Sequence, residues 1–232
     1  NVKNFMVDLT TTGKEAVLPL LEIRTIPPGE TTPSGGSQAG GPPQPKKNAR
    51  LKGLAVFKGD KMVGELEDSE TKGFLWIVGK AQKGTLAFPV DNSGVKEPVQ
   101  VTVEMTRVAS KIDTDIVQGK PVIILKIETE GNIGEFSRTD AKITPEDIEL
   151  VNQGYRKAIE EQVMLTLHKC QKELQADIFG FGTYVHRQQL RYWKEHNLEQ
   201  KWPELFPEIR VQVEIEANVR RTGLIQDSIK IE

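Results

Sequence analysis

The sequence predicts an α+β fold, in which a mostly antiparallel β-sheet packs against one long α-helix and shorter helices. The first observation is a helical period of apolar residues that runs from residue 144 to residue 179. The second is the alternation of apolar and polar residues in segments 99–106 and 209–220. The third is the order of the segments, because strands, then a long helix, then short helices and a final strand are typical of α+β proteins.

The N-terminal segments predict a short helix and two strands separated by a loop. Residues 2–9 carry apolar side chains on one helical face, and residues 16–23 predict a buried strand in which Pro19 indicates an edge position or a bulge. Residues 26–48 are rich in Pro, Gly, Ser and Thr, a composition that cannot bury a core. We therefore predict a flexible loop that joins strand 16–23 to a neighbouring strand at 51–57. A surface insertion and a recognition arm are the two alternatives for this loop.

The middle of the chain predicts a hairpin, a short helix and further strands. Gly59 and Asp60 have turn chemistry, and a return strand begins at Met62. Asp68 or Ser69 is suited to cap a helix that continues to Val78. The remaining strands are expected at residues 85–90, 99–106 and 121–130, with a continuation at 133–136.

The long helix has the strongest start signal in the chain. Thr144 is suited to cap the free amides, Pro145 fits the first helical position, and two carboxylates follow at the positive end of the helix dipole. Gly180 and Gly182 are expected to end the helix in a left-handed cap.

The C-terminal part predicts short helices and one clear strand. Residues 183–196 predict one or two short helices, and residues 198–206, which contain Trp202-Pro203, predict a looser stretch. Residues 209–220 alternate strictly and predict a strand, and residues 224–232 are expected to be a frayed tail.

Composition excludes several classes of protein. The 232 residues carry 33 acidic and 31 basic side chains, a balance that implies no affinity for nucleic acid or an anionic membrane. No apolar run approaches the roughly 20 residues of a membrane-spanning helix, and no signal peptide is visible. Because the chain begins at Asn1, we expect it to be an excised, soluble portion of a longer protein.

The sequence contains no complete motif for catalysis, cofactor binding or metal binding. The Gly-Lys pair near Gly79 has the wrong spacing for a phosphate loop, and no dinucleotide fingerprint, Cys-x-x-Cys or His-Glu-x-x-His motif is present. Cys170 falls on the apolar face of the long helix, which predicts a buried thiol that reacts slowly. The carboxylates form no motif that isolates one of them from water. We expect no catalytic residue, no cofactor and no metal.

An aromatic and arginine cluster is the candidate for partner binding. Aromatic and Arg side chains dominate the energetics of protein interfaces, so we predict a docking surface there. The alternative is that the rings are core residues that cover one end of the long helix. The candidate residues are Phe181, Tyr184, Arg191, Trp193 and Trp202.

Several runs of residues together resemble the Ger(x)C family, the C-subunit lipoproteins of bacterial spore nutrient germinant receptors. The resemblance covers roughly residues 16–223, and the motifs occur in the family's order. The matching runs are Leu-Lys-Gly-Leu-Ala-Val-Phe-Lys at 51–58, Asp-Lys-Met-Val-Gly-Glu-Leu at 60–66, Glu-Thr-Lys-Gly-Phe-Leu-Trp at 70–76, Gly-Lys at 79–80, Asp-Ile-Phe-Gly-Phe-Gly at 177–182, and Trp193, Trp202 and Phe206.

The resemblance implies a non-enzymatic subunit that acts with an A subunit and a transporter-like B subunit at the outer face of the spore inner membrane. Its membrane attachment would be an N-terminal lipid anchor that this chain lacks. The resemblance also implies two domains: residues 1–84 would be the C-terminal part of a middle α+β domain, and residues 85–223 the C-terminal α+β domain. We therefore expect binding of protein partners and no small-molecule ligand.

Two other classes of function stay open. A direct nutrient-binding domain would need a concave site with a few convergent polar groups. A hydrolase, the weaker alternative, would need convergent carboxylates in a pocket.

Overall fold

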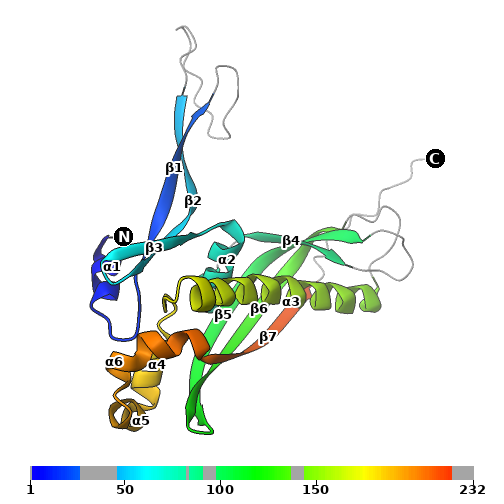
Figure 1. The fold of residues 1–232 in the computed structure, drawn as a ribbon. Coiled ribbons are helices and arrows are strands. Elements are labelled where there is room, and N and C mark those ends of the chain that lie inside the picture. Colours follow the sequence, from blue (N-terminus) through cyan, green and yellow to red (C-terminus); the bar gives the residue numbers. More distant parts are fainter. Residues whose placement is uncertain (1, 27–45, 82–83, 91–97, 137–143, 221–232) are drawn as a thin grey trace, which may run out of the picture.

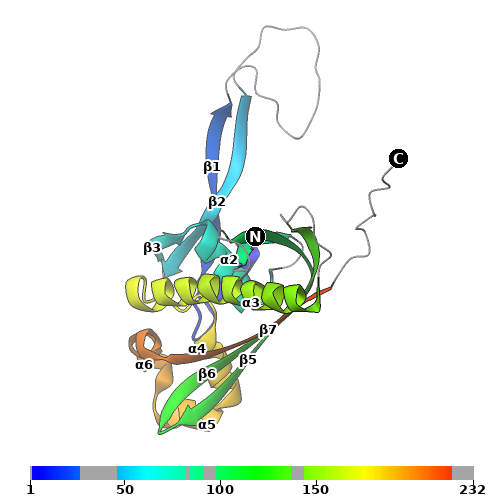
Figure 2. The same cartoon turned by 90° about the vertical axis from the view of Figure 1, so that its right-hand side faces the viewer.

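A computed structural model describes residues 2–26, 46–81, 84–90, 98–136 and 144–220. Its β-strands form a three-stranded sheet in the order β1-β2-β3 and a four-stranded sheet in the order β4-β5-β6-β7. The long helix α3 (Pro145–His168) runs across the middle of the molecule, with the small sheet on one side and the C-terminal helices on the other (Figure 1, Figure 2). The predicted α+β class is thereby confirmed.

The small sheet is antiparallel and follows a short helix, α1 (Val2–Leu9). Its strands are β1 (Val17–Ile26), β2 (Lys46–Lys58) and β3 (Lys61–Leu66). β1 pairs with β2 along its whole length, which confirms that the two predicted strands are neighbours. Pro19 lies in the edge strand, where the N–H that proline lacks is not needed by a second neighbour.

The far part of β1 and β2 extends beyond the rest of the sheet. β3 pairs with β2 only from Leu54 to Lys58, so residues 21–26 and 46–51 pair with each other alone. This two-stranded part, here called the ribbon, projects from the body of the molecule (Figure 1, Figure 2). The predicted loop 26–48 is therefore shorter at both ends than expected, and its residues 27–45 lie outside the described part of the chain.

The larger sheet consists of three antiparallel strands and one parallel strand. Its strands are β4 (Thr85–Val90), β5 (Val99–Val117), β6 (Lys120–Phe136) and β7 (Arg210–Arg220). β7 returns from the end of the chain to pair in parallel with β6, and the other pairs are antiparallel.

The outer edge of β5 beyond β4 is covered by two glutamine side chains. β4 pairs only with Val99–Glu104, so the distal part of β5 pairs with β6 on one side and has no described strand on its outer side. The side chain of Gln188 accepts the N–H of Thr114 at 2.8 Å and donates to the carbonyl of Ile112 at 3.1 Å. Gln189 donates to the carbonyl of Thr114 at 3.0 Å. These bonds satisfy edge groups that would otherwise need water or another strand.

Helix α3 begins as predicted and ends earlier than predicted. Thr144 and Asp147 form a capping box, in which each side chain binds the backbone N–H of the other. The α-helix ends at His168, and one π-helical turn, Lys169–Glu173, follows it. The chain then turns at Gln175 with φ +49°, so the predicted end near residue 179 and the glycine cap are wrong.

The apolar face of α3 lies on the larger sheet and on α2 (Asp68–Ile77). The predicted face is buried at Val151, Tyr155, Ile159, Val163, Leu167 and Cys170. The N-cap residue of α2 is Glu67, one position before the predicted Asp68, and its N–H donates to the Glu70 carboxylate at 2.7 Å.

The C-terminal helices fold back onto the end of α3. The predicted short helices are α4 (Phe181–Gln188) and α5 (Leu190–Glu195). The stretch predicted to be looser is instead a helix, α6 (Leu198–Leu205), followed by a 3-10 turn, Phe206–Glu208. Leu198, Trp202 and Phe206 recur every four residues and are buried, which explains the helix despite Pro203. The predicted tail 224–232 lies outside the described residues.

Candidate functional site

Three of the five residues predicted for partner binding lie in the core. Phe181, Trp193 and Trp202 expose 0%, 3% and 3% of their surface. Tyr184 is half-buried and packs against the same core, and Arg191 is exposed on α5. The core alternative therefore applies to the three buried rings, and partner contact through Tyr184 and Arg191 stays a prediction.

The buried rings form an aromatic cluster between α3 and α4–α6. Trp193 and Trp202 have ring centroids 5.6 Å apart, and Phe179 stacks on Phe181 at 5.0 Å. Phe206 lies within 6.5 Å of both phenylalanines. Rings in such contacts stabilise the fold through buried area and ring–ring interaction.

At the edge of this cluster Asp177 is buried, and no Lys, Arg or His among the described residues forms an ion pair with it. Its Oδ1 accepts the N–H groups of Gly180 at 2.9 Å and Phe181 at 3.1 Å. Its Oδ2 accepts the N–H of Gly182 at 2.8 Å and the indole N–H of Trp202 at 2.9 Å. Asp177 thus caps the start of α4 and ties α6 to it.

Burial raises the pKa of the Asp177 carboxyl to about 6, although the four N–H donors oppose this shift. A buried acid with a raised pKa is a usual candidate for catalysis. Both carboxylate oxygens, however, are engaged by N–H groups of the protein itself, and Asp177 exposes only 3% of its surface, so a substrate has little access to the carboxyl. The geometry therefore indicates a structural acid.

The connection between α1 and β1 packs against the same place. The carbonyl of Gly13 accepts the N–H of Thr183 at 3.2 Å, and the N–H of Glu15 donates to the carbonyl of Asp177 at 2.8 Å. A Cβ at Gly182 would lie 2.6 Å from the Trp202 indole nitrogen and 2.7 Å from the Cα of Gly13. We call this meeting point of three segments the Asp177 junction. The sequence signal that could have found it is an Asp three residues before the first glycine of Gly-Phe-Gly, an N-terminal capping pattern.

The ribbon has one apolar face and one polar face. Leu21, Ile23 and Leu51 expose 68%, 70% and 53% of their surface, and Leu21 lies directly opposite Leu51. On the other face, Glu22 lies opposite Arg50. Alternation of this kind usually marks a strand face that is covered, yet no described part of this chain covers it.

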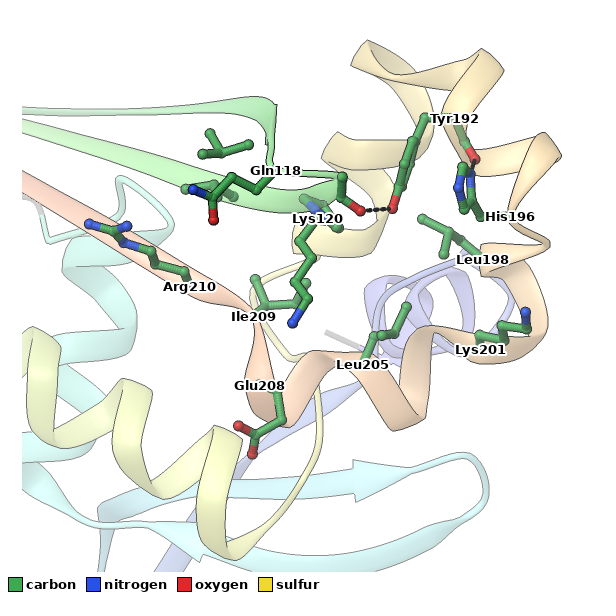
Figure 3. Close-up of a pocket in the computed structure, with 14 residues that line it drawn as sticks. Gln118, Lys120, Tyr192, His196, Leu198, Lys201, Leu205, Glu208, Ile209 and Arg210 are labelled. Carbon is green, nitrogen blue, oxygen red and sulfur yellow. Dashed lines mark hydrogen bonds between the residues drawn. The ribbon is translucent and has the colours of Figure 1, made fainter.

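A cavity of about 450 Å³ lies between the tip of the β5–β6 hairpin, α5, α6 and the start of β7 (Figure 3). We call it the hairpin cavity. Its buried apolar lining includes Val122, Leu198 and Ile209. Tyr192 closes one side by donating its hydroxyl to the carbonyl of Gly119 at 2.8 Å (Figure 3). The sequence did not predict this cavity, because its walls come from four separate segments.

The cysteine, the candidate metal ligands and the helices can be compared with the sequence predictions. Cys170 is buried, as predicted, and burial together with the nearby Asp177 charge raises the pKa of its thiol. Within the described ranges, no three His, Cys, Asp or Glu side chains gather as a metal site would require. None of the described helices combines the length and apolar character needed to cross a membrane.

Comparison with known proteins finds a family model and relatives that are all described as spore germination proteins. A family model described as spore germination B3/GerAC like, C-terminal, matches residues 52–223. Spore germination protein KC of Bacillus subtilis (strain 168) is 28% identical over 188 residues, which cover 80% of this chain and 44% of that protein. Spore germination protein B3 of the same strain is 25% identical over 183 residues, 78% of this chain and 47% of that protein. The chain therefore spans less than half the length of these two relatives.

A solved structure agrees with the fold. The crystal structure of the GerBC protein matches with a TM-score of 0.63 and 24% identity, and the match covers 74% of this chain and 52% of that one. At that identity the match shows a shared fold. The family model covers most of the chain, from β2 to the end of β7, and the chain therefore belongs to the spore germination B3/GerAC-like, C-terminal family.

Proposed function

We propose that this chain is part of the C subunit of a spore nutrient germinant receptor and that it acts, without enzymatic activity, by binding the A and B subunits. Membership of the germination family supports the role in germination. The proposed location is the outer face of the spore inner membrane, with a lipid anchor outside this chain as the attachment. The observation that carries the binding proposal is the exposed apolar face of the ribbon.

Exposure of this apolar face to water costs free energy, which a partner that covers the face would recover. Burying a Leu or Ile side chain contributes about 1.5–3 kcal/mol, and Leu21, Ile23 and Leu51 lie together on one surface. A two-stranded ribbon is also marginally stable by itself, so a partner would add order as well as burial. A protein surface with complementary apolar side chains fits this face.

The absence of enzymatic activity is proposed on the chemistry of the described residues. Asp177 is buried and has both carboxylate oxygens engaged by N–H groups of the protein itself. The Cys170 thiol is buried, and burial disfavours the reactive thiolate. Burial raises the pKa of both Asp177 and Cys170. Both side chains serve the fold.

We also propose a domain boundary near Gly84. It separates the small sheet and α2 from the larger sheet and α3. Residues on both sides, such as Ile77 and Val163, belong to one buried hydrophobic cluster. We therefore expect the two parts to unfold together.

The test is capture of detergent-solubilised A and B subunits on this chain. The double variant Leu21→Ser/Ile23→Ser removes the apolar face, and we expect capture to weaken by tenfold or more. The matched control, Glu22→Ser/Arg24→Ser, changes the opposite face of the same strand and should capture like the wild type. The changed side chains are exposed except for the half-buried Glu22, whose ion pair with Arg24 lies at the surface, so both melting temperatures should stay close to that of the wild type.

Two results would contradict the proposal. Equal capture by the wild type and the apolar-face variant would exclude the ribbon as the contact. Failure of the wild type to capture either subunit, with the fold intact by circular dichroism, would contradict the function itself.

A further inference from the structure

The hairpin cavity combines an apolar lining with positively charged side chains. Val122, Leu198 and Ile209 provide buried apolar surface, and the volume of about 450 Å³ is in the range of small-molecule sites. Lysine and arginine side chains contribute to the same lining (Figure 3). An apolar space with cationic side chains around its rim suits a ligand with an apolar body and an anionic group.

The charge around the cavity is not balanced. Lys120, Lys201 and Arg210 line it, and none of the three forms an ion pair with another residue in the described part of the chain. Glu208 is the one carboxylate in the lining, and Lys172 binds it at 2.8 Å. The three cations are therefore available to an anion.

The cavity walls are held in place without a ligand. The hairpin turns through Gln118 and Gly119, which have φ of +51° and +72°, as a tight two-residue turn requires. The Tyr192 hydroxyl binds the turn at Gly119, and the ring of His196 stacks on Tyr192 with centroids 4.0 Å apart. A pre-formed site loses little conformational entropy on binding.

We propose that the hairpin cavity binds a small amphipathic anion, a carboxylate on an aliphatic or aromatic body. The apolar body would lie against Val122, Leu198 and Ile209, and the carboxylate would bind Lys120, with Lys201 farther along the rim of the cavity (Figure 3). A free amino acid fits less well, because three cations repel its ammonium group and the single carboxylate of the lining is already paired. This binding site is separate from the ribbon and does not depend on the subunit contacts proposed above.

Calorimetric titration tests the site with octanoate for an aliphatic body and phenylacetate for an aromatic body. We expect saturable binding of at least one of them at one molecule per chain. Octanol should bind about tenfold more weakly than octanoate, and octylamine and leucine should show no saturable binding. The two anions together show which kind of apolar body the cavity accepts.

Variants locate the binding. Lys120→Ala/Lys201→Ala should lower the affinity for the anion by about tenfold. The control Lys72→Ala/Lys194→Ala removes the same charge elsewhere and should leave the affinity unchanged. Leu205→Trp fills the cavity and should abolish binding in a chain whose circular dichroism is normal. The proposal is overturned if neither anion binds, if octylamine binds as well as octanoate, or if both lysine pairs give the same affinity.

Discussion

At the scale of single residues, Asp177 shows how hydrogen bonds stabilise a buried carboxylate that no cation from the described part of the chain neutralises. Moving a carboxylate out of water is costly unless hydrogen bonds replace its hydration. Here backbone N–H groups of residues 180–182 and the indole of Trp202 take the place of water. The carboxylate lies at the start of α4, where the helix dipole also favours negative charge. One side chain thereby fixes the positions of α4 and α6.

The raised pKa of Asp177 predicts a pH dependence of stability with a definite sign. Between about pH 4 and pH 6 the folded state holds a proton that the unfolded state has lost, so the contribution of this residue falls as pH rises. The loss amounts to about 3 kcal/mol and is complete above about pH 7. Asp177→Asn has no such proton, so its free energy of unfolding relative to the wild type should change across this window. Urea unfolding from pH 4 to pH 8 measures it, and parallel curves would contradict the prediction.

Trp202 provides the second prediction at this scale. Because its ring is buried in the aromatic cluster, Trp202→Ala should lower the free energy of unfolding by about 3–5 kcal/mol. Trp202→Phe keeps most of the packing and loses only the hydrogen bond to Asp177, which should cost about 1–3 kcal/mol. Arg191→Ala on the exposed surface is the control and should be nearly neutral. An unchanged melting temperature in Trp202→Ala would restore the interface interpretation of this ring.

At the scale of elements, the sequence predicts those whose signals are local. Thr144 and Pro145 place the start of α3 because capping depends on adjacent residues. The alternation in 99–106 and 209–220 gives β5 and β7, since a half-buried strand needs nothing more than a period of two.

The sequence predictions are wrong or incomplete where contacts between distant residues determine the local structure. After α3 ends at His168, distant partners hold the π-helical turn: Gln171 donates to the carbonyls of Phe206 and Ile209, which are 35 and 38 residues away. Proline suggests an irregular segment at 198–206, but burial of one helical face outweighs that signal. The hairpin cavity has no local signature, because four elements meet there only in the folded chain.

The crossing of α2 and α3 gives a prediction at the element scale. A Cβ at Gly73 would lie 2.1 Å from the Gln162 carbonyl oxygen, so Gly73→Ala should force the helices apart. We expect a loss of about 1–3 kcal/mol, although alanine favours the helix by up to about 1 kcal/mol. Fluorescence of Trp76, whose indole donates to the Gln162 side chain at 3.0 Å, should report the shift. Lys72→Ala, exposed on the same helix, is the control, and equal stability of the two variants would refute the packing argument.

At the scale of the whole molecule, the two proposed sites lie at opposite ends. The ribbon projects at one end and the β5–β6 hairpin turn lies at the other, with α3 and its core between them (Figure 1, Figure 2). Exposed substitutions at this distance should act additively on stability. Subunit capture and anion binding can therefore be removed separately, which lets one variant serve as the folding control of the other.

The predicted loop at the end of the ribbon provides the last prediction. Ile26 and Lys46 are the final paired residues, so replacing residues 27–45 by Asn-Gly joins them through a two-residue turn. Loop closure then costs less entropy, and we expect a melting temperature that is unchanged or a few degrees higher. A plain deletion of 28–45 leaves Pro27 alone between the paired residues and should open that last pair.

Calorimetry and subunit capture together separate the two interpretations of this loop and test whether the segment packs against the body. A tolerated insertion predicts that the Asn-Gly variant keeps both its melting temperature and its capture of the A and B subunits. A recognition arm predicts lost capture at an unchanged melting temperature, because the contact is removed and the apolar face at Leu21 and Ile23 is kept. A drop of many degrees would show that the segment packs against the body, contrary to the prediction from its composition.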